Sequence, residues 1–200
     1  MTPPLGLILA GGRATRMGGG DKGLLRLGGQ TLLDRVVDRI SPQVAGLALN
    51  ANGDPARFAA LNMPVLPDGI AGFLGPLAGI LAGLDWAADQ GAETVVTVAA
   101  DTPFFPCDLV PRLQLAGEGM AHPLVLAATP DPKRGHARHP TFGLWPVALR
   151  HDLRTGLSAG VRKVVAWSDG HAGRIAPFPD ERAFFNINTP EDLETARAML

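Results

Sequence analysis

Apolar and polar positions alternate along the first half of the chain in a way that predicts strands separated by helices. Four short apolar runs are typical of buried strands: residues 5–10, 44–49, 64–66 and 94–100. Between these runs, apolar residues recur at helical spacing after Thr31, which forms a capping-box pattern with Asp34, and after Pro76, which suits a first helical position. Strands that alternate with helices favour an α/β fold with a parallel sheet.

The second half of the chain is less regular. A strong helix start is present at Thr189-Pro190, and a polar, basic loop is expected over residues 129–138. We expect strands over 124–128, 139–144, 175–178 and 184–188, and helices over 108–115, 146–153 and 161–167. Because there is no internal repeat, linker or low-complexity segment, the chain is predicted to form a single domain over residues 1–200.

Polar or glycine residues follow each of the predicted strands in the first half. Gly11, Asn50, Asp68 and Asp101 all stand at predicted carboxyl ends of strands. Open α/β sheets bind their ligands in the crevice at that edge. The sequence therefore predicts one nucleotide site, built by the first half of the chain.

The segment after the first strand has the composition of a phosphate-binding loop. It contains Gly11, Gly12, Arg16 and Lys22, with three further glycines at 18–20. Glycines allow close approach of backbone N–H groups to an anion, and the cations neutralise it. The segment matches neither GxxxxGK[ST] nor GxGxxG, so it is a nucleotide loop of another kind. The alternative is an ordinary glycine-rich turn.

Three polar residues at strand ends each have two interpretations. Asp101, at the tip of the most apolar strand, is suited to Mg²⁺, which prefers oxygen ligands and keeps substrate phosphates in its shell. It could equally cap the following turn. Asn50 and Asp68 could bind a base or ribose, or could serve as turn residues.

Composition excludes several classes of protein. The chain has 200 residues, 46% hydrophobic and 18% charged, and a formal net charge of −1, which argues against disorder and against a nucleic-acid surface. The single cysteine allows no internal disulfide. We expect no signal peptide, no membrane span and a cytoplasmic location. The cations of the 129–138 loop and Arg162-Lys163 belong either to a solvated surface or to a second anionic substrate.

Several motifs, in this order, resemble those of the GT-A-like nucleotidyltransferases, and within them the molybdenum cofactor guanylyltransferases. They are LAGGRATRMGGGDK at 9–22, NAN at 50–52, PD at 67–68, GPLAGI at 75–80, DTPFFP at 101–106, HPTFGLW at 139–145 and FFNINTPEDL at 184–193. The resemblance covers essentially the whole chain. It implies a three-layer α/β/α Rossmann-like domain that joins GMP from GTP to the terminal phosphate of molybdenum-molybdopterin and releases pyrophosphate, with a GTP-binding first half and a molybdopterin-binding second half.

The resemblance also implies roles for individual residues. GTP would be bound by Leu9, Ala10, Gly11, Gly12, Lys22, Asn50, Asp68 and Asp101. Asp101 would hold Mg²⁺, and Arg16, Lys22 and Asp101 would carry the catalysis. Asn186 and Asn188 match a pair near the reaction centre, while His139, Arg162 and Lys163 are candidates for the pterin side. Proteins of molybdenum insertion and molybdoenzyme maturation are candidate partners.

Two departures and three other functions stay open. The variant loop Gly18-Gly19-Gly20-Asp21 leaves the reach of that segment undefined, and the 129–138 loop is not diagnostic of the pterin side. A cytidylyltransferase on the same pterin and a sugar-phosphate nucleotidyltransferase are alternative enzymes. A non-catalytic nucleotide-binding cofactor carrier is the alternative from another class.

Overall fold

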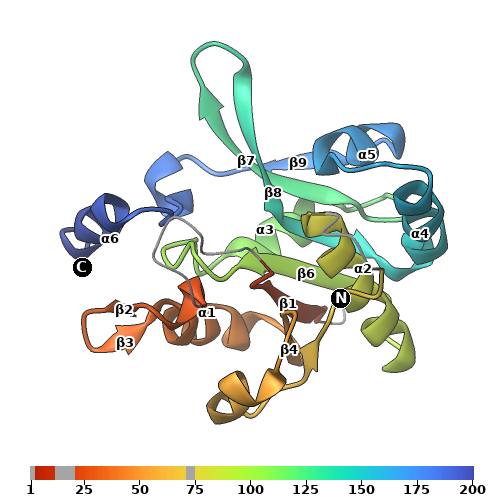
Figure 1. Cartoon of the computed structure of the whole chain (residues 1–200). Coiled ribbons are helices and arrows are strands. Elements are labelled where there is room, and N and C mark those ends of the chain that lie inside the picture. The colour runs from red at the N-terminus through yellow and green to blue at the C-terminus, as the bar shows by residue number, and fades with distance from the viewer. Residues whose placement is uncertain (1–2, 12–20, 71–74) are drawn as a thin grey trace.

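The computed structural model describes residues 3–11, 21–70 and 75–200. A seven-stranded sheet with the order β5-β4-β1-β6-β8-β7-β9 runs through the molecule (Figure 1). Its strands are, in chain order, β1 (Leu5–Leu9), β4 (Leu47–Asn50), β5 (Val65–Leu66), β6 (Thr94–Ala99), β7 (Val125–Asp131), β8 (Gly135–Pro146) and β9 (Arg174–Pro177). A separate hairpin pairs β2 (Arg26–Leu27) with β3 (Gln30–Thr31).

The sheet is mostly parallel, as the alternation of strands and helices predicts. β1 pairs in parallel with β4 and with β6, and β4 pairs in parallel with β5. β8 is the exception, because it runs antiparallel to both β6 and β7. The predicted edge strand near residues 175–178 is present as β9, which pairs in parallel with β7.

Helices cover both faces of the sheet, so the molecule has three layers. The α-helices are α1 (Leu32–Ile40), α2 (Pro76–Asp89), α3 (Leu109–Ala116), α4 (Arg150–Ser158), α5 (Val164–Gly170) and α6 (Pro190–Arg197). Short 3-10 helices are η2 (Lys22–Leu24), η3 (Ser41–Gln43), η4 (Pro55–Leu61), η5 (Val147–Leu149) and η6 (Glu181–Phe184). Alternate residues of β1 face opposite layers: Ile8 packs in the core with α1 and α3, and Leu7 packs in the core with α2, α4 and α5.

The helix starts follow the capping chemistry expected from the sequence. Thr31 and Asp34 form a capping box at α1, and Thr189 and Asp192 form another at α6. α2 begins at Pro76 and packs against the sheet through Gly83, which lies close to Leu7 of β1. A Cβ added at Gly83 would lie 2.5 Å from Leu7 Cδ2, so glycine is what permits this approach.

The prediction of a basic loop over residues 129–138 is wrong. Those residues belong to the hairpin of β7 and β8, which projects beyond the rest of the sheet (Figure 1). The Asp131 carboxylate accepts hydrogen bonds from the backbone N–H groups of Lys133 and Arg134, each at 2.8 Å, and so stabilises a tight turn. The polar composition reflects two exposed strand edges rather than an irregular loop.

Other predicted elements near the C-terminus also differ. Residues 185–188 form no strand; instead η6 ends at Phe184 and the chain continues to α6 with one backbone hydrogen bond of 2.9 Å from Ile187 N–H to the Asp101 carbonyl. The helix expected from residue 161 begins at Val164. The helix expected over 146–153 is divided between η5 and α4 and extends to Ser158. Within the described ranges, no helix has the length and apolar character needed to cross a membrane.

Candidate active site

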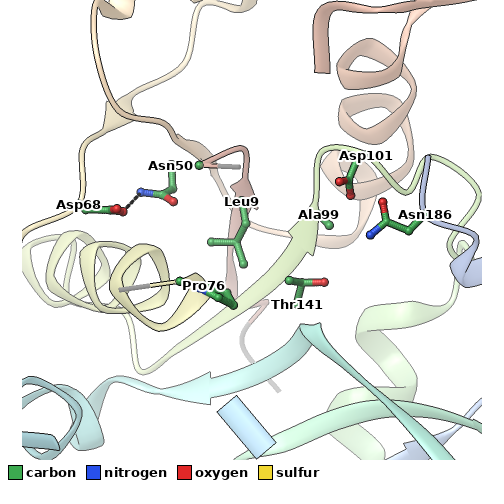
Figure 2. Close-up of a pocket in the computed structure, with 10 residues that line it drawn as sticks. Leu9, Asn50, Asp68, Pro76, Ala99, Asp101, Thr141 and Asn186 are labelled. Carbon is green, nitrogen blue, oxygen red and sulfur yellow. Dashed lines mark hydrogen bonds between the residues drawn. The ribbon is translucent and has the colours of Figure 1, made fainter. Parts of the chain in front are cut away.

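A cavity of about 490 Å³ opens at the carboxyl ends of β1, β4, β5 and β6. The parallel pairing of these strands brings their ends to one edge, as the sequence predicts. Figure 2 shows Asn50 and Asp68 on one side of the cavity and Asp101 and Asn186 on the other. The cavity is lined by Leu9, Gly11, Asn50, Asp68, Gly75, Pro76, Ala99, Asp101, Thr141 and Asn186.

Lys22 and Asp101 form an ion pair beside the cavity. Lys22 Nζ lies 2.8 Å from Asp101 Oδ2, and the two side chains are 17% and 23% exposed. The same ammonium donates to Asn188 Oδ1 at 2.6 Å. One cation therefore connects the beginning of η2, the end of β6 and the segment before α6. Because these side chains are largely shielded from water, their charges are screened less than those of a surface pair.

The capping box of α6 fixes the position of Asn188. The backbone N–H of Asn188 donates to Asp192 Oδ2 at 2.8 Å, and the N–H of Thr189 donates to the same oxygen at 2.9 Å. The hydrogen bond from Asn188 is the main reason that the pKa of Asp192 lies below its usual value of 3.8; those from Thr189 and the charge of Lys22 act in the same direction. Asp192 is thus held as an anion that anchors Asn188.

On the opposite side of the cavity, two amides hold the carboxylate of Asp68. Asn50 Nδ2 donates to Asp68 Oδ1 at 3.0 Å, and Asn52 Nδ2 donates to Asp68 Oδ2 at 2.8 Å. Asn52 Oδ1 also accepts from the Asp68 backbone N–H at 2.9 Å. Asn50 is only 3% exposed, and a Cβ added at Gly79 would lie 2.2 Å from Asn50 Oδ1. Glycine at 79 is therefore what leaves room for this amide.

Arg57 of η4 joins the two sides of the site. Its Nε lies 2.6 Å from Asp21 Oδ2, and its Nη2 donates to the backbone carbonyl of Asn52. Asp21 directly precedes Lys22, so the guanidinium ties the entry of η2 to the residue that holds Asp68. Arg57 belongs to none of the sequence motifs, whereas Asp21 belongs to the 9–22 motif without an assigned role.

His139 lies in β8, two residues before Thr141, which lines the cavity. Its ring stacks on Phe184 with centroids 4.1 Å apart, and Nε2 lies 3.0 Å from Thr129 Oγ1. Desolvation in this setting lowers the pKa of His139 to about 4. The imidazole is therefore neutral near pH 7 and offers hydrogen bonding and stacking rather than charge.

Arg162 and Lys163 lie between α4 and α5, away from the cavity lining. Arg162 Nη1 donates to the carbonyl of Leu157, near the end of α4, at 2.8 Å and to the carbonyl of Val161, which follows that helix, at 2.7 Å. In the view of Figure 1, α4 and α5 lie at the opposite end of the molecule from α6. The structure thus places this basic pair apart from Asn188, whose segment leads into α6.

Two sequence-predicted residues, Gly12 and Arg16, lie outside the described residues. Of the remaining set, the structure brings Leu9, Gly11, Asn50, Asp68, Asp101 and Asn186 to one cavity. Lys22 contacts both Asp101 and Asn188. Ala10 continues β1 beyond its end through a 2.9 Å hydrogen bond to the Asn50 carbonyl. The backbone after β1 therefore lies against the end of β4.

The donor set at Asp101 suits a hard cation. A carboxylate oxygen and an amide oxygen, Asp101 Oδ2 and Asn188 Oδ1, already share one positive charge, the Lys22 ammonium. Mg²⁺ takes one or two protein oxygens and completes its shell with water and phosphate. Among the described residues, no group of three or more His, Cys, Asp or Glu could hold a metal ion, so a metal here would depend on ligands from the substrate.

Sequence reasoning missed several contributors to the site. Asn52 precedes Gly53 and so looks like a turn residue, and Asp192 looks like a helix cap only. Thr141 could have been suspected from its place in the HPTFGLW motif at 139–145. In the structure Gly143 pairs with Thr97 of β6, which brings Thr141 level with the carboxyl end of that strand. Gly75, with φ +72°, lies at the start of α2 and could have been suspected from the Gly-Pro pair.

Comparison with known proteins gives a consistent picture. Residues 6–172 match the model of the MobA-like NTP transferase domain family. Among curated proteins, the molybdenum cofactor guanylyltransferase of Cereibacter sphaeroides (strain ATCC 17029 / ATH 2.4.9) is 52% identical over 98% of this chain and 96% of that protein. The protein of the same name from Bradyrhizobium sp. (strain ORS 278) is 50% identical over 97% of this chain and 92% of its own length.

Solved structures show the same fold at lower identity. Molybdopterin-guanine dinucleotide biosynthesis protein A from Archaeoglobus fulgidus superposes with a TM-score of 0.71 at 22% identity, covering 98% of this chain and 97% of that one. 4-Diphosphocytidyl-2C-methyl-D-erythritol synthase from Anaerococcus prevotii gives a TM-score of 0.76 at 16% identity, covering 99% and 96%. At these identities the likeness concerns the fold alone.

Proposed function

The chain belongs to the MobA-like NTP transferase family, and from that premise we propose that it transfers GMP from GTP to the terminal phosphate of molybdenum-molybdopterin, with pyrophosphate as the other product. The observation that carries this proposal is the 52% identity, over 98% of the chain, to a protein named molybdenum cofactor guanylyltransferase. The nucleotidyltransferase class is supported independently by the likeness of residues 6–172 to the family model.

In this proposal one side of the cavity binds the nucleoside of GTP and the other side binds its phosphates. Asn50 and Asp68 bind the nucleoside, because they present an amide and a carboxylate at the ends of adjacent strands. Leu9, Ala10 and Gly11 provide backbone against the nucleotide, and Lys22 neutralises its phosphates. Gly12 and Arg16 belong to the same set on the strength of the sequence alone. Purine selection over cytosine is expected from the LAGG sequence at residues 9–12, where the cytidylyl relatives tend to carry LAAG.

The reaction needs charge neutralisation more than proton transfer. The attacking group, a phosphate monoester, is already anionic at neutral pH, so no side-chain base has to activate it. Lys22 and Asp101 lie together at the edge of the cavity. Lys22 supplies a positive charge and Asp101 a metal ligand beside the place where GTP and the phosphate of the pterin would meet. We propose that Asp101 and Asn188 hold Mg²⁺, which when bound stabilises negative charge on the transferred phosphate and on pyrophosphate.

The pterin side is assigned to the second half of the chain. Asn186 lines the cavity opposite Asp68, and the neutral His139 ring lies in β8 two residues before Thr141. Arg162 and Lys163 remain candidates for contact with the pterin substrate. We treat residues 1–200 as one domain, since one sheet takes strands from both halves. We further propose that the enzyme acts in the cytoplasm and passes its product to proteins of molybdoenzyme maturation.

The decisive experiment supplies purified protein with Mg²⁺, molybdenum-molybdopterin and either GTP or CTP. We expect the guanine dinucleotide and pyrophosphate with GTP and little product with CTP. A preference for CTP would favour the pterin cytidylyltransferase. Product with a sugar 1-phosphate but not with the pterin would favour a sugar-phosphate nucleotidyltransferase. Tight GTP binding without pyrophosphate release would favour a non-catalytic carrier.

A further inference from the structure

We propose that the ammonium of Lys22 occupies the place of the metal ion while the nucleotide is absent, so that the metal and the nucleotide bind together and displace it. This inference rests on the proposed function, because it concerns how that site is loaded. It starts from the two contacts of Lys22 Nζ, 2.8 Å to Asp101 Oδ2 and 2.6 Å to Asn188 Oδ1. Both acceptors are oxygen atoms of the kind that Mg²⁺ binds.

A divalent ion and the ammonium cannot share these oxygens. Mg²⁺ binds its oxygen ligands at about 2.0–2.1 Å, inside the space that the ammonium fills, and the two cations repel each other. The Lys22 and Asp101 side chains are 17% and 23% exposed, so solvent screens this repulsion only partly. A metal ion alone must therefore break the ion pair and leave Lys22 without its partner.

GTP removes this obstacle because its phosphates offer Lys22 a new anionic partner. We infer that only the side chain moves, because the backbone next to Lys22 is buried and in contact with its neighbours. The next residue, Gly23, is buried, and a Cβ added there would lie 3.5 Å from the Cβ atoms of both Ala100 and Leu33. The flexible four-carbon stem of a lysine allows its charge to move from one oxygen cluster to another while the chain stays in place.

The backbone segments that carry the two protein oxygens are held by bonds that do not involve Lys22. Asn188 is held by its own backbone N–H, which donates to Asp192 at 2.8 Å. The Asp101 backbone is held by the 2.9 Å hydrogen bond from Ile187 N–H to its carbonyl. Neither bond involves Lys22, so the backbone of the proposed cation site stays in place when its occupant is exchanged. Metal affinity should consequently be low in the nucleotide-free protein because Lys22 competes for the site.

The test is a titration of the nucleotide-free protein with Mn²⁺. Binding is measured as the decrease of the electron paramagnetic resonance signal of free Mn²⁺. We expect Lys22→Met, which keeps the length of the side chain but not its charge, to bind Mn²⁺ at least about tenfold more tightly than wild type, the scale of one partly screened charge contact. Lys22→Arg, which retains a cation, should stay close to wild type. The double variant Lys22→Met/Asp101→Asn should lose the gain.

Unchanged or weaker Mn²⁺ binding by folded Lys22→Met would overturn the proposal. Lys22→Gln provides a second neutral side chain if Lys22→Met does not fold, and thermal melting checks both. An equal gain in the double variant would also overturn it, because the ion would then be bound elsewhere. The titration needs neither pterin nor turnover, so its result is separate from the failure of the proposed function, which would appear as absence of dinucleotide product in wild type.

Discussion

The backbone N–H of Asn188 donates to the carboxylate of Asp192 at 2.8 Å, and this contact ties the start of α6 to the candidate active site. The Asn188 side chain in turn accepts from Lys22, which pairs with Asp101. A helix-capping carboxylate thus orients an amide that lies in contact with the charged centre. The C-terminal helix, remote in sequence from the glycine-rich segment, acts as part of the support of that site.

Replacing Asp192 should lower stability and loosen Asn188. We expect Asp192→Ala to melt about 2–4 °C below wild type at pH 7, the scale of one capping interaction in a chain of this size. Because the folded pKa of Asp192 is depressed below 3.8, its contribution is present above that value and is lost as the pH falls further. The difference in melting temperature should therefore shrink in acid. A difference independent of pH would contradict this account.

Lys22 and Asp101 should both be required for turnover. We expect Lys22→Ala and Asp101→Ala each to reduce turnover by ~10²-fold or more, the scale of losing one electrostatic stabiliser. Asp108→Ala is a matched control, because Asp108 is an exposed carboxylate paired with Arg112 on α3. Its turnover should stay near that of wild type. Steady-state dinucleotide formation measures all three, and near-normal rates in either site variant would refute the assigned role.

Asn52 should act on GTP binding through Asp68. Its side chain accepts from the Asp68 backbone and donates to the Asp68 carboxylate. We expect Asn52→Ala to raise the KM for GTP about tenfold, on the scale of one charge-assisted hydrogen bond, with kcat changed much less. Asn52→Asp should raise the KM for GTP further, because it places a second carboxylate against that of Asp68. A fall in kcat at unchanged KM would place Asn52 in the chemical step instead.

Gly79 should tolerate no side chain. A Cβ there would lie 2.2 Å from Asn50 Oδ1 and 2.9 Å from Leu9 Cδ2, so α2 or the Asn50 amide must move. We expect Gly79→Ala to cost about 1–3 kcal/mol of stability, as overpacking does, and to weaken GTP binding. Gly170→Ala is the control, since Gly170 lies in α5 and a Cβ there meets nothing within 4 Å. Denaturant unfolding of the two variants distinguishes local crowding from a general effect of alanine.

The sequence predicts the first half of the fold well because its signals are local. Apolar runs, the Thr31 capping box and Pro76 at a first helical position each act within a few residues, and the structure contains the expected elements there. It also predicts that Asn50 and Asp68 meet, since parallel strands end at one edge.

The missed features depend on contacts between distant segments. In the 129–138 hairpin, a local turn at Asp131 brings β8 back antiparallel to β7, but the continuation of β8 beside β6 joins segments that are distant in sequence. Residues 184–188 have strand composition, yet their apolar side chains pack into the core beside η6 and form no ladder. The link from Lys22 to Asn188 spans 166 positions and could not be read from spacing.

The last prediction concerns His139, whose pKa is lowered to about 4 by desolvation. In the unfolded chain its pKa returns to the ordinary value of 6.5. Between these values the unfolded state binds a proton that the folded state does not, so stability falls as the pH decreases from about 6.5 to about 4. Above 6.5 both states are neutral and His139 contributes no pH dependence. Below about pH 4 His139 is charged in both the folded and the unfolded state, and its contribution to the free energy of unfolding changes no further.

His139→Gln isolates this effect because glutamine does not titrate. We expect the free energy of unfolding of wild type to fall more steeply than that of His139→Gln between pH 6.5 and 4, and the two slopes to agree above pH 7. His122→Gln, at an exposed histidine outside the cavity lining, is the matched substitution and reports any general effect of replacing a histidine with glutamine. The His139 ring resonance, followed by NMR, should stay at its neutral position at pH 6. Protonation of that ring near pH 6.5 would contradict the burial argument, because desolvation against Phe184 is what keeps it neutral.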